Sequence, residues 1–267
     1  MTQPTQPTKG ERSHYVRVPA PWIAGCSDVG LKHRSNQDAF CLAARPGDER
    51  TAVLAVADGV STAAGSELAS LVASEAACMH LANRIEEGTA PNLAFVQAFA
   101  EAQDAVLSAR QGDDAAACTL VAGIMTPDSI AVGNVGDSRA YWLGDDGLCL
   151  LLSTDDSMAQ ARIMLGMSRA EAEQSNQAHS ITKWLGRDAA NVTPSVITHQ
   201  PTTNGWLLLC TDGLWNYASS PEEMHHLVKG FVERTASPGA IAEGLVDWAN
   251  SKGGRDNITV AVARYEA

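Results

Sequence analysis

Short apolar runs alternate along this chain with longer stretches in which apolar residues recur every three or four positions. In residues 62–88 the apolar positions include Leu68, Leu71 and Val72, a spacing that predicts a long amphipathic helix. A second helix is expected over residues 91–111, because a proline stands near its start. Further helices are predicted at 220–231 and 237–253, and strands at 20–28, 38–45, 51–58, 116–125, 129–137, 139–147, 148–153, 192–200, 205–212 and 256–265.

The order of these elements favours an α+β protein with antiparallel sheets and flanking helices over alternating strand–helix units. Each helix has one apolar face, which must cover a sheet. Residues 155–191 are polar, contain methionine and are weakly helical, and we interpret them as a flap inserted between strands. We expect a disordered tail at residues 1–15 and a single domain at residues 16–267.

Composition narrows the classes of function. The 267-residue chain has a formal net charge of −12, which argues against a general binder of nucleic acid or of anionic membranes. No apolar run is long enough to span a bilayer, and the N-terminus lacks the apolar core of a signal sequence. The six cysteines have no C-x-x-C spacing and lie in apolar runs, as buried thiols do in a reducing compartment. We therefore expect a cytoplasmic protein that binds neither membrane nor nucleic acid.

Five aspartates border the apolar runs, namely Asp38, Asp58, Asp137, Asp212 and Asp256, and two of them are followed by glycine. Two like charges about 4 Å apart repel by roughly 4 kcal/mol at an effective dielectric near 20, so these groups can converge only with cations or protons between them. Oxygen ligands without Cys or His select Mg²⁺ or Mn²⁺. One Asp-Gly pair is more often a turn, so the metal hypothesis depends on the recurrence of the pattern.

Five sequence blocks resemble, in the same order, those of the metal-dependent protein serine/threonine phosphatases of type 2C. The blocks are GLKHRSNQDAF (30–40), VLAVADGVS (53–61), VGNVGDSRAYW (132–142), LLLCTDGLW (207–215) and GGRDNITVAVA (253–263). The short chain and the segment AHSITKWLG are similar to the bacterial branch of that family. The resemblance implies a four-layer α-β-β-α sandwich, with two antiparallel sheets flanked by helices.

The resemblance also implies a role for each acidic residue. Asp58 would bridge two Mn²⁺ or Mg²⁺ ions, and the carbonyl of Gly59 would complete the coordination of one of them. Asp212 and Asp256 would bind the second ion, and Asp38 would hold metal-bound waters.

The remaining matches concern a third ion and the support of the ligands. Asp137 matches the acid that helps to bind a third, weaker ion in bacterial members. Asn257 is expected to support Asp256 by a hydrogen bond, and Gly213 and Gln37 adjoin ligands. Gln37 replaces an acidic residue of the family, so one ion is expected to bind more weakly.

Three other positions depart from the family pattern. The phosphate-binding arginine aligns with His33 rather than Arg34, so the catalytic set comprises Asp38 with either of these two residues as the phosphate contact. Asn216 stands where an aspartate is often found, which weakens the third metal site. Val60 replaces the general-acid histidine of animal members, so a water is expected to protonate the leaving group.

We interpret the chain as a monomeric protein serine/threonine phosphatase in which a water bridging two divalent metals attacks the phosphorus. Its partners would be phosphorylated proteins made by a serine/threonine kinase, and the flap would be the specificity element. One alternative is a catalytically weak phosphatase-like module that binds phosphorylated partners. Another is a metal-dependent nuclease or nucleotide hydrolase, which the net charge of −12 disfavours.

Overall fold

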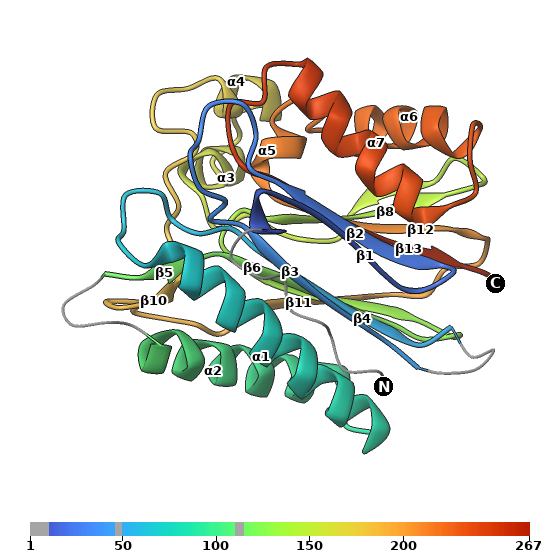
Figure 1. Cartoon of the computed structure of the whole chain (residues 1–267), viewed down its shortest axis with the longest axis horizontal. Coiled ribbons are helices and arrows are strands. Elements are labelled where there is room, and N and C mark those ends of the chain that lie inside the picture. The colour runs from blue at the N-terminus through green and yellow to red at the C-terminus, as the bar shows by residue number, and fades with distance from the viewer. Residues whose placement is uncertain (1–10, 46–49, 110–114) are drawn as a thin grey trace.

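Two antiparallel sheets lie face to face, and a pair of helices covers the outer side of each (Figure 1). The computed structural model describes residues 11–45, 50–109 and 115–267. The larger sheet has the strand order β1 (His14–Ala20), β2 (Ile23–Asp28), β13 (Ile258–Tyr265), β12 (Gly205–Cys210), β8 (Arg139–Gly144) and β9 (Cys149–Leu151). The smaller sheet has the order β11 (Ser195–His199), β7 (Ile130–Val135), β6 (Leu120–Met125), β4 (Ala52–Ala57) and β3 (Ala39–Ala44), and β5 (Ala117–Cys118) pairs separately with β10 (Leu185–Gly186).

The two long helices α1 (Ser66–Glu86) and α2 (Pro91–Ala109) cover the smaller sheet, and α6 (Pro221–Val232) and α7 (Pro238–Ser251) cover the larger one. Serine N-caps followed by proline start both α6 and α7, which is a favoured way to begin a helix. The expected α+β sandwich with four layers is therefore confirmed.

Three apolar cores fill the three interfaces between neighbouring layers of the sandwich. In β4, Val53 and Ala55 face the helices α1 and α2, whereas Leu54 and Val56 face the other sheet. Because successive side chains of a strand point to opposite faces, a strand buried on both sides must be apolar throughout. This explains why the strands that lead to the aspartates read as continuous apolar runs.

The predicted tail is wrong for residues 11–15. Glu11–Ser13 form a short 3₁₀ helix, and β1 begins at His14. The Tyr15 ring is buried and stacks on Phe40 with a centroid distance of 4.9 Å. The start of the strand was missed because at this sheet edge only Tyr15 of its seven residues is buried, and His14 and Arg17 interrupt the apolar pattern. Residues 1–10 of the expected tail lie outside the described residues.

The flap segment, which we define as residues 155–191, lies between β9 and β11, as expected. It contains α3 (Met158–Met164), α4 (Arg169–Glu173) and β10. The four-residue helix α5 (Asp212–Trp215) was not predicted, and it lies near α3 and α4 at one end of the sandwich (Figure 1). Across the described ranges, no helix is both long enough and apolar enough to cross a membrane.

Candidate functional site

Strand pairing in the smaller sheet places Asp38 beside Asp58. Strands β3 and β4 are antiparallel, with Ala39 opposite Ala57. Asp38 directly precedes the first of these residues and Asp58 directly follows the second. The two carboxylates are therefore neighbours at this end of the sheet, although they are well separated in the sequence.

The larger sheet contributes the other three aspartates at the same end of the sandwich. In this sheet Cys210, at the end of β12, pairs with Arg139 of β8 and with Val260 of β13. Asp212 follows the end of β12, while Asp137 and Asp256 precede the starts of β8 and β13. Asp58 interacts electrostatically with all four of the other aspartates, so the two sheets together bring the five predicted acids to one site.

The electrostatics of the site disfavour charge on its carboxylates. Burial raises the pKa of Asp38 and that of Asp212 to about 7 in each case. Burial, followed by the charges of the neighbouring aspartates, raises the pKa values of Asp58 and Asp137 well above the ordinary range. Only cations or protons can relieve this repulsion.

Hydrogen bonds fix two of these carboxylates from one side. The Thr211 hydroxyl donates to Asp38 Oδ2 at 2.8 Å, and Asn216 Nδ2 donates to Asp212 Oδ2 at 3.1 Å. Asp212 Oδ1 is buried and has no hydrogen-bond partner among the described residues. A buried carboxylate oxygen without a donor is an available ligand for a cation.

Glycine is required next to two of the aspartates because the backbone packs closely there. A Cβ atom on Gly59 would lie 2.6 Å from the Gln37 carbonyl oxygen and 2.8 Å from that of Ser66. A Cβ atom on Gly213 would overlap the Asn257 carbonyl. The two Asp-Gly pairs are therefore points of close chain approach as well as turns.

Asn257 makes the expected hydrogen bond to Asp256, but through its backbone. Its backbone N–H, rather than its side chain, donates to Asp256 Oδ1 at 2.8 Å. The side chain accepts from the Gln37 N–H and donates to the carbonyls of Val29 and Ser35. Asn257 therefore holds the loop that precedes Asp38.

His33 contacts an aspartate of the site, whereas Arg34 is exposed. His33 Nε2 is 3.3 Å from Asp256 Oδ1, whereas the Arg34 side chain is exposed. A contact between His33 and one of the five aspartates is thus established.

Arg139 is a residue of this region whose function the sequence did not reveal. It is 1% exposed, and its guanidinium lies 3.7 Å from the centroid of the Trp215 ring. Trp215 Nε1 donates to the Asp137 carbonyl at 3.0 Å. The sequence did contain a signal for this role, namely an arginine at the start of an otherwise apolar strand. A buried arginine must be paired, so its presence there indicates a buried partner.

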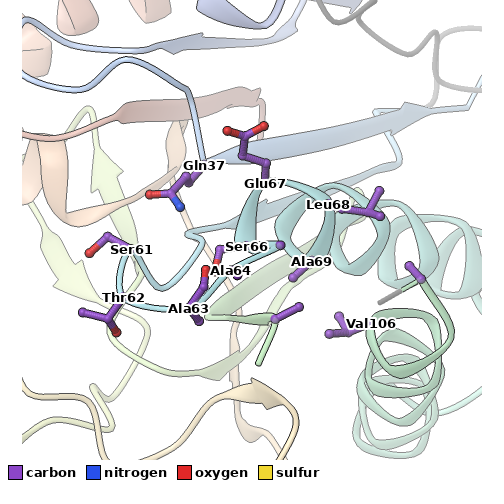
Figure 2. A pocket seen from close by; sticks show the side chains of 13 residues that line it. Gln37, Ser61, Thr62, Ala63, Ala64, Ser66, Glu67, Leu68, Ala69 and Val106 are labelled. Carbon is purple, nitrogen blue, oxygen red and sulfur yellow. Dashed lines mark hydrogen bonds between the residues drawn. The ribbon is translucent and has the colours of Figure 1, made fainter. Parts of the chain in front are cut away.

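Two cavities are lined by residues next to the aspartates, namely Gln37 beside Asp38 and Asn216, which donates to Asp212. One of about 550 Å³ is lined by Gln37, by the loop of residues 61–65 and by the start of α1, and Figure 2 shows Gln37, Ser61 and Thr62 around it, with Val106 of α2 nearby. The other, of about 470 Å³, lies between α4 and the residues that follow Asp212. Groups much larger than a phosphate therefore have space next to residues that neighbour Asp38 and Asp212.

The donor set fits oxygen-binding divalent cations. Within the part of the chain that the structure describes, no three His, Cys, Asp or Glu side chains already stand in a metal-binding arrangement. The chemistry nevertheless suits Mn²⁺ or Mg²⁺, because the site offers carboxylate oxygens, the Asp212 oxygen without a donor and strong mutual repulsion.

Comparison with known proteins gives a consistent result. A family model described as protein phosphatase 2C matches residues 31–250. The serine/threonine phosphatase stp of Listeria innocua is 37% identical over 145 residues, which make up 53% of this chain and 54% of that protein. The chain spans about half the length of the curated relatives it matches first.

Solved structures support the same fold. The Mycobacterium tuberculosis serine/threonine phosphatase PstP/Ppp is 26% identical, with a TM-score of 0.73 over 94% of this chain and 99% of the other. The catalytic domain of the serine threonine protein phosphatase PstP in complex with two manganese ions is 24% identical, with a TM-score of 0.70 over 94% of this chain and 99% of the other.

Proposed function

Because the chain belongs to the protein phosphatase 2C family, we propose that it hydrolyses phosphoserine and phosphothreonine in proteins with the help of divalent metals. The observation that carries this proposal is the convergence of five aspartates, from both sheets, at one end of the sandwich. The alternative of a weak binding module is not favoured, since these acids are all retained.

The metal set that fits the site is two Mn²⁺ or Mg²⁺ ions, and a PstP structure with two manganese ions supports that number. In this proposal Asp58 and the Gly59 carbonyl would hold the pair together with Asp212 and Asp256, and Asp38 would hold the associated waters. When bound, such ions lower the pKa of water and neutralise charge on phosphoryl oxygens.

The chain's own residues would orient and support this set. Thr211 keeps Asp38 Oδ2 occupied, so that this carboxylate presents a fixed orientation. Asn216 occupies Asp212 Oδ2 and leaves Oδ1 available to a ligand. A third ion at Asp137 would bind more weakly, because Asn216 supplies an amide where the family resemblance leads one to expect a carboxylate.

We propose that His33, rather than Arg34, contacts the phosphate. Its distance of 3.3 Å from Asp256 Oδ1 supports this assignment, and the solvent exposure of Arg34 argues against the alternative. An imidazole N–H can donate to a phosphate oxygen, although it cannot make the two parallel hydrogen bonds of a guanidinium.

The remaining expectations become part of the proposal. The enzyme would act as a monomer in the cytoplasm and reverse the action of a serine/threonine kinase, with the described residues from Glu11 onward as one domain. The six free cysteines agree with a reducing compartment. The net charge of −12 supports protein rather than nucleic-acid substrates.

The variant Asp58→Asn tests the proposed function. We expect turnover of p-nitrophenyl phosphate and of a phosphothreonine peptide to fall about a thousandfold, because an amide cannot replace a carboxylate shared by two cations. Rates are measured across a Mn²⁺ titration, and circular dichroism establishes that the fold is retained. The matched control is Asp104→Asn on the exposed side of α2, which should keep the wild-type rate.

Wild-type rates in Asp58→Asn would refute the role of Asp58. A wild-type protein that binds the phosphopeptide without turning it over at any Mn²⁺ concentration would instead establish the binding module. Faster release of phosphate from nucleotides than from the peptide would favour the nucleotide hydrolase.

A further inference from the structure

Arg139 connects the sheet to the flap segment through buried polar contacts. Its Nε lies 3.1 Å from both carboxylate oxygens of Asp155, and its Nη2 donates to Asp155 Oδ2 at 2.7 Å. Asp155 is the first residue of the flap segment and is itself buried. The same Nη2 also donates to Glu173 Oε1 at 2.8 Å. One guanidinium thus holds both the base of the flap segment and its second helix.

Glu173, the last residue of α4, is the point at which that helix is attached to the body of the protein. Besides Arg139, it accepts from the Ser219 hydroxyl at 2.8 and 2.7 Å. Among the described residues, the hydrogen bonds and ion pairs that join α4 to the body all involve Glu173. Although partial burial raises the pKa of Glu173, hydrogen bonds from Ser219 and Arg139 outweigh this effect and hold that pKa below its ordinary value.

Apolar packing contributes little to the position of α4. The flap segment has its own small apolar cluster of Ala159, Ala172 and Ala178, which is separate from the three main cores. Between α3 and α4, Met164 and Leu165 are 78% and 88% exposed. Since three alanine side chains bury little area, polar contacts must determine how α4 lies against the body.

The attachment point is directly connected to the candidate site. Arg139 stacks on Trp215, which belongs to the short helix that begins at Asp212. The cavity of about 470 Å³ has α4 on one side and the residues after Asp212 on the other. Movement of α4 would therefore change the width of a space that opens beside a proposed metal ligand.

We propose that Glu173 is a positioning residue that fixes α4 against Ser219 and Arg139, and thereby shapes the subsite that receives the polypeptide around the phosphorylated residue. This inference rests on the proposed function, and it adds a specificity determinant to it. A small aryl phosphate needs only the metal ligands, whereas a phosphoprotein must also fit between α4 and the body. Loss of the Glu173 contacts is thus expected to affect the two substrates differently.

The test uses Glu173→Gln in the full chain, with Glu171→Gln as its matched control. Both substitutions remove one charge from the same helix, and glutamine can replace Glu171 in the capping box that it forms with Ser168. Ser219→Ala is the second variant, because it removes a second partner of Glu173 from the body of the protein while leaving the ion pair between Arg139 and Glu173 in place.

For Glu173→Gln and Ser219→Ala we expect KM for a phosphoprotein to rise at least about fivefold, with kcat/KM for p-nitrophenyl phosphate within about twofold of wild type. Hydrogen exchange at the amides of residues 169–180 should be at least about fivefold faster, with β12 and β13 unchanged. Glu171→Gln should match wild type in each measurement.

Equal losses on both substrates, or an unchanged exchange rate in residues 169–180, would overturn the proposal. If the wild-type protein turns over neither substrate with Mn²⁺, the proposed function fails and the specificity role fails with it. The exchange measurement would still decide independently whether Glu173 holds α4, so the two failures are distinguishable.

Discussion

At the scale of single residues, the site combines acids that the sequence identified with supports that it did not. The five aspartates were visible because each interrupts an apolar run, and a charge beside a buried strand needs a reason. Thr211 and the backbone contact of Asn257 were not visible, because hydrogen bonds of hydroxyl and amide groups depend on which loops meet. The environment of Arg139 was ambiguous, because the side chain of an arginine that follows Gly-Asp-Ser could equally have been exposed to solvent.

The choice between His33 and Arg34 can be settled at this scale. We expect His33→Ala to lower kcat/KM for a phosphothreonine peptide about tenfold at saturating Mn²⁺, because it removes a side-chain nitrogen that lies 3.3 Å from Asp256 Oδ1. Arg34→Ala, which alters an exposed side chain next to it in sequence, should stay within about twofold of wild type. A larger loss in Arg34→Ala than in His33→Ala would assign the phosphate contact to the arginine.

At the scale of elements, α1 differs from the other covering helices because its buried face is partly polar. Ser66, Ser70 and Ser74 are buried there, and each donates to a backbone carbonyl. The Ser70 hydroxyl donates to the Gln37 carbonyl, which ties the helix to the loop that leads to Asp38. The helix therefore positions the site as well as covering the sheet.

The partly buried Glu75 of α1 makes stability depend on pH. Burial raises its pKa to about 7, partly offset by Arg12, and its Oε1 has no hydrogen-bond partner among the described residues. Since the folded-state pKa lies above the ordinary value of 4.5, this group's contribution to stability is complete below pH 4.5 and is lost as the pH rises through about 7.

Replacement of Glu75 by glutamine should remove this dependence. Between pH 5.5 and pH 8, wild type should lose about 1–2 kcal/mol more of its unfolding free energy than Glu75→Gln, after allowance for solvent screening. Urea unfolding at both pH values measures the difference, and Glu101→Gln on the exposed face of α2 is the control. Parallel pH profiles for wild type and Glu75→Gln would show that the carboxyl is not perturbed.

At the scale of the whole molecule, apolar packing holds the two sheets together, whereas repulsion among carboxylates at one end of the sandwich destabilises the folded state. The core between the sheets includes Phe40, Leu54, Trp142 and Leu207. At the end of the sandwich that carries the five aspartates, the carboxylates repel one another. Folding without cations is therefore less favourable than the size of the apolar cores alone would indicate.

Removal of divalent metal should destabilise the protein. At a Mn²⁺ concentration of about 100 times Kd, each site adds about 2.7 kcal/mol, which corresponds to a rise in Tm of roughly 5–10 °C for a domain of this size. Thermal unfolding at pH 7.5 with Mn²⁺ and with EDTA measures the shift, which should be much smaller in Asp58→Asn. Identical Tm values with Mn²⁺ and with EDTA in the wild type would mean that the aspartates do not bind the ion.

The sequence by itself determined the layered α+β fold, the identity of the five acids and the presence of an inserted segment between β9 and β11. These follow from local rules, because a strand buried on both faces must be apolar and a charge beside it interrupts the pattern. Only the tertiary structure decided that β1 belongs to the sheet, that His33 contacts Asp256, and that Glu173 of the flap segment hydrogen-bonds to Arg139. Each of these depends on contacts between residues far apart in the chain, and no local periodicity encodes such contacts.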